Sequence, residues 1–462
     1  MTLIKNISGF RGTIGGQNLD NLTPVDIVSS ICAYSRLIKE NNSNSSNLTV
    51  ITGRDGRKSG RMIHSIVNST FNSMGINVID AGLSTTPTVC WGVLNNDFVG
   101  GLMITASHNP EKYNGLKFFN SDGEFLSKED VFKLIEYSES KNHVFSFNEF
   151  LGSISEYDSL IDDHVDAILN LKILPINEIK ELNLTVCADA INSGGSIAIP
   201  KLLDRLNIKY NIINSEIKGV FNHTPEPLAE NLIDLSKSIQ VNNSDFGIAV
   251  DPDVDRLVFF DEKGEILGEE YTQVFCSDFV LSKNKGDTVS TLSSSNALKD
   301  LTISYGQKYY STPVGEMNVV KKMKEVKSIV GGEGGGGIIY PELHYGRDAL
   351  VGIALFLALL VERKCKVSEL KSQYSEYFMK KRKITLKDSK LIEKSFKVIA
   401  ENYSKLSPNT EDGVRIDFED AWVHMRKSNT EPIIRIFAEA NSQDIANRYA
   451  LKIEKEIKSI SD

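Results

Sequence analysis

The chain of 462 residues is too long for one ordinary core and predicts roughly three or four domains of about 100 to 150 residues each. Its formal net charge of −9 argues against general nucleic-acid binding, because contacts to a phosphate backbone need a positive surface. The five cysteines are far apart and form no CxxC motif, which argues against a disulfide framework and a zinc site and favours a reducing, cytoplasmic location.

The sequence predicts no membrane span. The N-terminal residues MTLIKNISGFRG lack the apolar run of a signal peptide. The most apolar stretch, residues 349–361, is shorter than the about 20 residues that cross a bilayer. We predict a buried helix there, with Asp348 as its N-cap.

From residue 48 to about residue 340, β-rich runs alternate with segments long enough for a helix. The first runs are residues 48–57, 76–87 and 100–110, and the rhythm returns over 184–250 and again from 287. This order is typical of α/β domains, and each cycle ends in an unusual loop. From about residue 370 the order changes to a helix, three strands and a helix, which predicts a small α+β domain.

The first unusual loop is TASHNP, residues 105–110. It follows the apolar residues 102–104, so Ser107 and His108 are predicted on a loop at the end of a buried strand. A serine nucleophile of the hydrolase type would need a GxSxG motif, which is absent here. Taken alone, the motif favours a turn capped by the serine hydroxyl.

The second loop is DPDVDR, residues 251–256. Asp251, Asp253 and Asp255 alternate, so their carboxylates can converge on one hard cation, for which Mg²⁺ is the natural occupant. An EF-hand would need a glycine where Arg256 stands, and a solvated acidic turn without an ion is the other alternative. The arginine beside the aspartates indicates a phosphate bound against the metal.

The third loop is GGEGGGG, residues 331–337. A flexible linker is one interpretation. Because the loop lies between two apolar segments, a ligand loop is the other: Glu333 would accept hydrogen bonds from sugar hydroxyls, and bare backbone would let the ligand approach. The loop alone favours neither interpretation.

The fourth loop is RKSNTEPIIRI, residues 426–436. Two guanidinium groups, with hydroxyl and amide donors between them, suit a dianionic phosphate. These donors belong to Arg426, Ser428, Asn429, Thr430 and Arg435. A structural turn capped by serine and asparagine is the alternative.

Taken together, the loops offer Ser107 a third role, in which its hydroxyl carries a phosphoryl group. A phosphoserine holds about −1.5 to −2 charges at neutral pH and needs a divalent ion and cationic neighbours. The acidic loop and the arginines can supply both.

These four loops, in this order and at roughly this spacing, resemble those of the α-D-phosphohexomutase superfamily over essentially the whole chain. The resemblance implies four domains around a central cleft: three similar α/β domains with mixed sheets and a C-terminal α+β domain. We expect them at residues 1–152, 153–256, 257–369 and 370–462. In that order they would carry the phosphoserine loop, the metal-binding loop, the sugar-binding loop and the phosphate-binding loop.

The resemblance implies a role for each matching residue. Ser107 is similar to the phosphoserine that donates and recovers phosphate. The phosphate on Ser107, together with Asp251, Asp253 and Asp255, resembles the set of Mg²⁺ ligands. His108 and Lys117 resemble residues that assist proton transfer, and Glu333 resembles the residue that binds sugar hydroxyls. The other matches are the active-site arginines Arg11 and Arg54, Arg256 beside the metal, and the phosphate clamp of Arg426, Ser428, Asn429, Thr430 and Arg435.

The chain departs from the family pattern at Gly337, where many members have a histidine. His344 either compensates for that histidine or only caps a turn. A base must also take the proton of the sugar hydroxyl, and Lys117 would suit this task if cationic surroundings lowered its pKa.

Residues 332–357 look most like those of phosphoglucosamine mutases. This implies an isomerase that interconverts glucosamine 6-phosphate and glucosamine 1-phosphate for UDP-N-acetylglucosamine synthesis. The reaction would use a phosphoserine enzyme and a hexose bisphosphate, which is both intermediate and activator. A phosphomannomutase or phosphoglucomutase is the alternative, and a phosphatase or a noncatalytic sugar-phosphate-binding protein are alternatives of other classes. Monomer and dimer both stay open.

Overall fold

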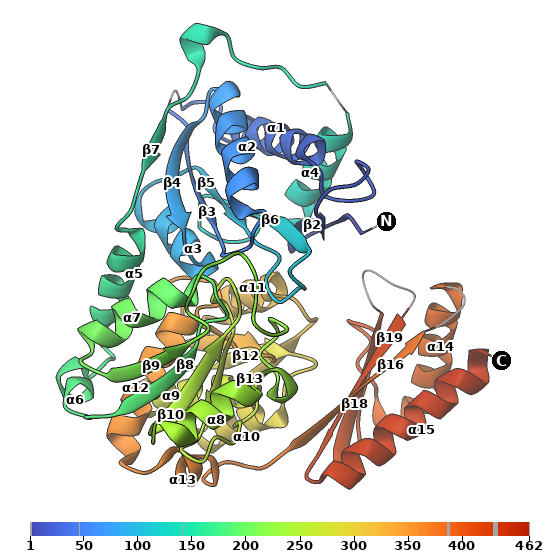
Figure 1. Cartoon of the computed structure of the whole chain (residues 1–462). Helices are drawn as coiled ribbons and strands as arrows, with labels where there is room; N and C mark the ends of the chain where they lie inside the picture. The colour runs from blue at the N-terminus through green and yellow to red at the C-terminus, as the bar shows by residue number, and fades with distance from the viewer. Residues whose placement is uncertain (1, 46, 141, 386–388, 428–432, 462) are drawn as a thin grey trace. The chain divides into compact units, whose positions relative to one another are not determined.

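The structure is a computed structural model that describes residues 2–45, 47–140, 142–385, 389–427 and 433–461 (Figure 1). The chain forms two compact units. One is Met1–Lys283 with Gly335–Leu370, and the other is Asn284–Gly334 with Lys371–Asp462. The segment expected as domain 3 contributes to both units, and the four expected boundaries stay a prediction.

The first unit begins with a mixed sheet in the strand order β1-β2-β6-β5-β3-β4-β7. The central strands β3, β4 and β5 and the edge strand β7 pair in parallel, whereas β1, β2 and β6 add antiparallel pairs. The strands are β1 Ile4–Asn6, β2 Gly9–Thr13, β3 Thr49–Arg54, β4 Asn77–Leu83, β5 Gly100–Ile104, β6 Tyr113–Phe119 and β7 Ile154–Glu156.

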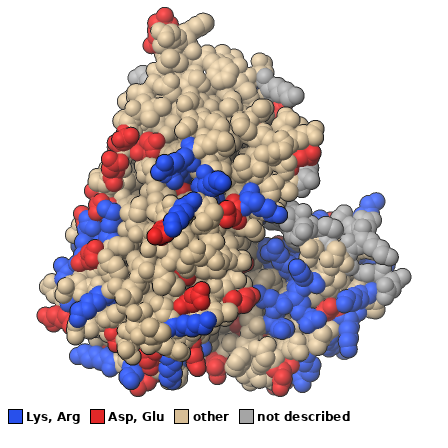
Figure 2. Space-filling view, in the orientation of Figure 1, with Lys and Arg blue, Asp and Glu red and all other residues tan. Residues whose placement is uncertain are grey.

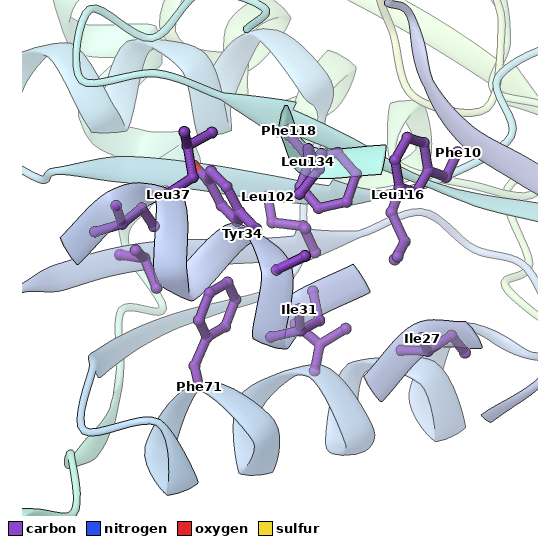
Figure 3. Close-up of a cluster of buried hydrophobic side chains, with 14 of the residues drawn as sticks. Phe10, Ile27, Ile31, Tyr34, Leu37, Phe71, Leu102, Leu116, Phe118 and Leu134 are labelled. Atoms are coloured by element: carbon purple, nitrogen blue, oxygen red, sulfur yellow. The ribbon is translucent and has the colours of Figure 1, made fainter. Parts of the chain in front are cut away.

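Helices cover both faces of this sheet because its central strands are apolar on both sides. Leu102 of β5 belongs to one buried cluster and Met103 to another, as expected for neighbouring residues of a strand. The first cluster, drawn in Figure 3, joins the strands to α1 (Pro24–Asn41), α2 (Gly60–Ser73) and α4 (Lys128–Glu139). The second joins them to α3 (Thr86–Asn95) and α5 (Leu160–Leu169).

A second sheet of the same unit has the strand order β11-β10-β8-β9 and carries the acidic loop at one end of β10. Its strands are β8 Thr185–Asp189, β9 Lys209–Ile213, β10 Phe246–Val250 and β11 Leu257–Phe260. Its unit also contains the helices α6 Ile176–Lys180, α7 Gly195–Arg205, α8 Ile233–Val241, α9 Tyr271–Lys283 and α12 Ala349–Arg363, and the strand β15 Gly337–Ile339. The apolar stretch 349–361 thus forms the buried helix α12, and Asp348 caps it by accepting hydrogen bonds from the backbone of Leu350 and Val351.

The second unit contains parallel strands in the order β13-β12-β14 and an antiparallel sheet in the order β16-β19-β18-β17. The parallel strands are β12 Thr288–Thr291, β13 Tyr309–Thr312 and β14 Val330–Glu333, with helices α10 Asn296–Ser304 and α11 Glu316–Val326. The antiparallel strands are β16 Phe378–Thr385, β17 Val414–Asp417, β18 Ala421–Lys427 and β19 Ile433–Ala440, with helices α14 Ser389–Asn402 and α15 Gln443–Ser461. The short helix α13, Val367–Lys371, leads into this part of the chain. The sequence pattern predicts the last three strands and both long helices but does not predict β16.

Within the described ranges, no helix is long and apolar enough to cross a membrane. Figure 2 shows Lys and Arg side chains interspersed with Asp and Glu over much of one face of the molecule, and gathered over part of the C-terminal sheet. The edge strand β16 of this sheet has the sequence FMKKRKIT, which is rich in Lys and Arg.

Candidate active site

The structure places Ser107 on a tight loop three residues beyond the end of β5. Its backbone has a positive φ of 46°, which is uncommon for a residue with a side chain. The backbone N–H donates to Thr105 Oγ1 at 2.8 Å, and the hydroxyl donates to Asp251 Oδ2 at 2.6 Å. The serine hydroxyl is therefore held against the acidic loop and does not cap its own turn.

Arg57 organises the loop that carries Ser107. Its side chain is buried, and its Nε donates to Asp55 Oδ2 at 3.0 Å. Its two terminal nitrogens donate at 2.5 to 3.0 Å to the backbone carbonyls of Ser107, Asn109, Pro110 and Tyr113. A planar guanidinium with its donors directed at fixed carbonyls sets the path of the whole loop.

The acidic loop brings Asp251, Asp253 and Asp255 together at the end of the buried strand β10. One carboxylate oxygen of each lies within 4.8 Å of the others, and the three residues are at most 1% exposed. Asp253 Oδ1 and Asp255 Oδ1 are buried and have no hydrogen-bond partner. Buried anionic oxygens without donors are costly, so this donor set fits a hard divalent cation such as Mg²⁺.

Electrostatic repulsion within this loop affects the pKa of Asp251. Burial, followed by the charges of Asp253 and Asp255, raises its pKa well above the usual value of an aspartate. Arg347 donates from NH2 to Asp255 Oδ2 at 2.8 Å, and with Lys117 it outweighs the effect of burial and holds the pKa of Asp255 below its usual value.

Lys117, on strand β6, lies between two of the aspartates. Its Nζ is 2.6 Å from Asp253 Oδ2 and 2.8 Å from Asp255 Oδ2. Burial alone would lower the pKa of the ammonium group, but the two carboxylates outweigh it and raise the pKa above its usual value. The condition under which Lys117 would suit the role of base, cationic surroundings that lower its pKa, is therefore not met, because the nearest charges are anionic.

His108 follows Ser107, and its Nδ1 lies 3.3 Å from the Ser107 hydroxyl oxygen. Burial, followed by the charges of Arg256 and Arg11, lowers the pKa of this imidazole well below its usual value. The ring is therefore neutral at physiological pH and has a nitrogen close to the serine oxygen.

The predicted arginines of the first unit have different surroundings. Arg11, on β2, donates from NH1 to Asn109 Oδ1 at 3.1 Å, next to the serine loop. Arg256 pairs with Glu226 at 3.4 Å, and its Nε is buried without a hydrogen-bond partner. Arg54, at the end of β3, donates to the carbonyl of Asp55 at 3.2 Å, and burial lowers the pKa of its guanidinium.

Four family models cover most of the chain. The alpha/beta/alpha domains I, II and III of phosphoglucomutase/phosphomannomutase match residues 3–144, 162–264 and 268–377, and the C-terminal domain matches residues 364–456. A phosphoglucomutase/phosphomannomutase of Thermococcus kodakarensis is 35% identical, with 95% of this chain and 96% of the relative covered. The chain belongs to the phosphoglucomutase/phosphomannomutase family.

Two further relatives extend the family comparison. A phosphoglucosamine/phosphogalactosamine mutase of Sulfurisphaera tokodaii is 32% identical, with 88% of this chain and 91% of the relative covered. The fold is that of a phosphoglucomutase/phosphomannomutase family protein of Burkholderia thailandensis, with a TM-score of 0.84, 23% identity, and 99% and 97% of the two chains covered. The chain is thus a phosphohexomutase, an isomerase with the four-domain α/β architecture expected from the sequence.

The sugar-binding and phosphate-binding residues expected in this phosphohexomutase belong to the second unit. Glu333 ends β14 as a buried residue, and its Oε1 accepts a hydrogen bond from the backbone of Gly315 at 2.9 Å. Arg426 on β18 and Arg435 on β19 are direct cross-strand neighbours, and Arg426 Nε donates to Asp412 Oδ2 at 2.7 Å. Ser428, Asn429 and Thr430 lie outside the described residues.

The structure also describes the surroundings of the departure at Gly337. A Cβ atom at this position would lie 2.3 Å from Cδ of Arg347, so the arginine side chain fills the space beside the glycine. His344 is buried and bonded to Asp348 and to the backbone of Gly346. The residue that reaches the acidic loop from this segment is Arg347, through Asp255.

The residues that hold the predicted groups in place carry no clear signal in the sequence; they are Asp55, Arg57, Thr86 and Arg347. Arg57 stands in GRDGR, the motif from which Arg54 was chosen, and Arg347 stands in the segment HYGRDA. In these two segments the sequence singled out the neighbours Arg54 and His344 instead. Such a motif does not distinguish an arginine that faces a ligand from one that is saturated by carbonyls or carboxylates of its own chain.

Proposed function

We propose that this phosphohexomutase interconverts glucosamine 6-phosphate and glucosamine 1-phosphate by passing phosphate through Ser107. The observation that carries the phosphoserine is the contact of 2.6 Å between the Ser107 hydroxyl and Asp251, beside two carboxylate oxygens that have no donor. A phosphoryl group on Ser107 would add oxygen ligands to the same place.

Asp251, Asp253 and Asp255, together with the phosphate on Ser107, would hold Mg²⁺. When bound, the ion would neutralise charge on the transferring phosphoryl group, which is the main need of phosphoryl transfer. Lys117 would bring further positive charge to the same oxygens, from its position at 2.6 Å from Asp253.

Proton transfer in this proposal falls to His108. Its imidazole is neutral because burial and two arginines lower its pKa. One ring nitrogen therefore carries no proton, and its lone pair can accept the proton of a sugar hydroxyl. Lys117 is fixed as an ammonium group and would instead position the phosphate and donate hydrogen bonds to it. Arg11, Arg54 and Arg256 would bind substrate phosphate in the first unit.

Glu333 would accept hydrogen bonds from the sugar hydroxyls, and Arg426, Ser428, Asn429, Thr430 and Arg435 would hold the phosphate that does not react. A bisphosphorylated hexose would form, turn round and return its other phosphate to Ser107, so the clamp must accept either end of the sugar. A trace of hexose bisphosphate would therefore activate the enzyme. The five cysteines lie in the described residues and form no disulfide there, which is in keeping with a cytoplasmic enzyme.

The choice of an amino sugar is supported by the relative named phosphoglucosamine/phosphogalactosamine mutase, at 32% identity. The second candidate, a phosphoglucomutase or phosphomannomutase, is favoured by the relative of that name at 35% identity. Substrate choice depends on a few hydrogen bonds to one hydroxyl or amine, so kinetics must decide between the two.

The test is a coupled assay with Mg²⁺ and a trace of hexose bisphosphate, comparing kcat/KM for glucosamine 6-phosphate, mannose 6-phosphate and glucose 6-phosphate. The proposal predicts a clear preference for the amino sugar. An equal or higher kcat/KM for mannose 6-phosphate or glucose 6-phosphate would overturn the assignment of glucosamine 6-phosphate as the substrate. Free phosphate is measured in the same samples, and release without isomer would identify a phosphatase. Binding without turnover of any of the three sugars would identify a noncatalytic binding protein.

A further inference from the structure

A second buried polar cluster lies in the first unit and has no part in the proposed reaction. It consists of His164, His344 and Asp348, whose side chains are at most 2% exposed. Asp348 Oδ2 lies 3.1 Å from His164 Nε2 and 3.3 Å from His344 Nε2. Two histidines and a carboxylate at this spacing suggest either a metal site or a hydrogen-bond network.

For His344, a backbone contact distinguishes between a metal site and a hydrogen-bond network. The N–H of Gly346 donates to His344 Nδ1 at 3.0 Å, so this nitrogen carries no proton and the other, Nε2, does. A nitrogen with a proton cannot bind a metal, and it instead donates to Asp348. The cluster is therefore a group of polar contacts around one ionised carboxylate, in which His344 is hydrogen-bonded to Asp348 and His164 lies beside it.

The tautomer of His164 is set in a similar way, by hydroxyl groups. Thr85 donates its hydroxyl proton to Thr88 Oγ1 at 2.7 Å, which leaves the Thr88 proton to point at His164 Nδ1, 3.0 Å away. His164 Nε2 then holds the ring proton and lies 3.1 Å from Asp348 Oδ2, a close polar contact without the geometry of a hydrogen bond. Together, the neighbouring His164 and His344 outweigh the effect of burial and keep the pKa of Asp348 below its usual value, so the carboxylate stays charged.

One end of this network leads to Asp253. Thr88 belongs to the first turn of α3, whose first residue is Thr86. The backbone N–H of Thr86 donates to the carbonyl of Asp253 at 2.9 Å, and its hydroxyl donates to Asp253 Oδ2 at 2.5 Å. The ring of His164 also stacks on Trp91 of the same helix, with ring centres 5.6 Å apart.

The other end leads to Asp255. Asp348 lies between Arg347, which donates to Asp255 Oδ2 at 2.8 Å, and Ala349, whose N–H donates to the carbonyl of Val254 at 3.2 Å. The acidic loop is therefore held from one side by the start of α3 and from the other by residues 347–349. His164 and Asp348 connect these two sides.

We propose that His164 and Asp348 form a brace that fixes the spacing of the Asp253 and Asp255 carboxylates and thereby the affinity of the acidic loop for Mg²⁺. Both are positioning residues, because they act through Thr88, Thr86 and Arg347 and touch none of the proposed ligands. The inference rests on the metal-binding role proposed for the acidic loop, but not on which sugar is the substrate.

The test interrupts the brace at separate points. His164→Asn places an amide near the position of Nδ1, so it can keep the contact to Thr88 but loses Asp348. His164→Gln reaches toward Asp348 but loses Thr88. Thr88→Val removes only the hydroxyl and keeps the shape of the side chain. Since partners that orient metal ligands typically contribute 10-fold to 100-fold in affinity, the dissociation constant of Mg²⁺ in calorimetry should rise about 10-fold to 100-fold in each variant.

Kinetics and a control separate positioning from loss of stability. At fixed Mg²⁺, kcat should fall while KM for the sugar phosphate stays unchanged. His64→Asn is the matched control, because it removes another buried histidine that contacts a carboxylate, Asp80 Oδ1 at 3.3 Å. It should lower the melting temperature without changing the Mg²⁺ dissociation constant.

Unchanged Mg²⁺ affinity in His164→Asn, His164→Gln and Thr88→Val, with only a lower melting temperature, would overturn the brace. If the histidine variants do not fold, Thr88→Val decides alone. A wild-type protein that binds Mg²⁺ but isomerises no glucosamine phosphate refutes the proposed substrate. The Mg²⁺ dissociation constants of the variants, measured by calorimetry, still test the brace in that case. A wild-type protein that binds no Mg²⁺ refutes both the metal assignment and the brace.

Discussion

Two regions of the molecule carry groups that suit phosphate, and they are built differently. In the first unit, Ser107, Lys117 and the three aspartates are at most 8% exposed, and each is held by several named contacts. In the second unit, Arg426 and Arg435 are neighbours on an antiparallel sheet; Arg435 is exposed, and the side chain of Arg426 is 15% exposed and paired with Asp412.

The difference agrees with the two tasks in the proposed reaction. Groups that transfer phosphate must hold atoms within a fraction of an ångström, and buried side chains held by several contacts do this best. A clamp that receives either end of a sugar needs long side chains with donors that can adjust. Substitutions in the first unit should therefore reduce kcat, and substitutions in the clamp should raise KM.

The largest effect is expected from Asp253→Asn. It removes one anionic ligand from the acidic loop and should reduce kcat on the order of 10³-fold, since charge stabilisation of this kind typically contributes 10²-fold to 10³-fold or more. The protein should stay folded, because one negative charge fewer relieves the repulsion that, after burial, raises the pKa of Asp251. Steady-state kinetics with a melting curve measures both, and the exposed Asp122→Asn is the control. Full activity in Asp253→Asn would contradict the metal assignment.

Arg57→Lys should come next. Lysine keeps a charge beside Asp55 but cannot donate to several carbonyls in fixed directions, so buried acceptors lose their partners. We expect a loss of about 3 kcal/mol in the free energy of unfolding, measured in urea, together with a lower kcat. Arg36→Lys, at an exposed i,i+4 pair with Glu40, is the control and should lose less than about 0.5 kcal/mol. Equal losses in the two variants would show that Arg57 does not organise the loop.

Arg426→Lys tests the clamp side of the comparison. The variant keeps the charge but loses the forked donors, so KM for the monophosphate should rise about 10-fold while kcat changes less. The assay is the same as for Asp253→Asn, so the two kinetic patterns can be set side by side. A loss in kcat with unchanged KM would remove the distinction between the two regions.

The smallest effect concerns pH. His424 lies on the strand of Arg426, and burial lowers its pKa to about 4. Between about pH 6.5 and pH 4 the unfolded chain binds a proton at this histidine that the folded chain does not, so stability falls as the pH is lowered through this range. His424→Gln should reduce the loss between pH 7 and pH 5 by about 1 to 2 kcal/mol. Identical slopes of unfolding free energy against pH in both proteins would refute this assignment.

The sequence predicted elements with a strong pattern and missed those without one. The apolar runs gave β3, β4 and β5, and the continuous run after Asp348 gave α12 with its cap. The edge strand β16 was missed because FMKKRKIT reads as a charged segment; its lysines and an arginine suit an edge strand, where they discourage pairing with other chains. The hairpin of β1 and β2 was also missed, because its strands are short and only partly apolar.

The candidate site shows the same limit. Residues that carry chemistry, such as Ser107 and Asp253, stand in short motifs whose neighbouring residues form the loop itself. Residues that position them, such as Arg57, Thr86 and His164, act through contacts between segments far apart in the chain, for example 167 positions from Thr86 to Asp253. Local pattern carries no information about such pairs, so only the fold reveals them.

The central claim is that Ser107 carries the phosphate. The most direct measurement is the intact mass of the protein, with peptide mapping, after incubation with Mg²⁺ and a hexose bisphosphate. The account predicts one phosphoryl group on Ser107 in the wild type, none in Ser107→Ala, and normal phosphorylation in the control Ser8→Ala, with turnover lost only in Ser107→Ala. Phosphate on another residue, or full turnover by Ser107→Ala, would contradict it.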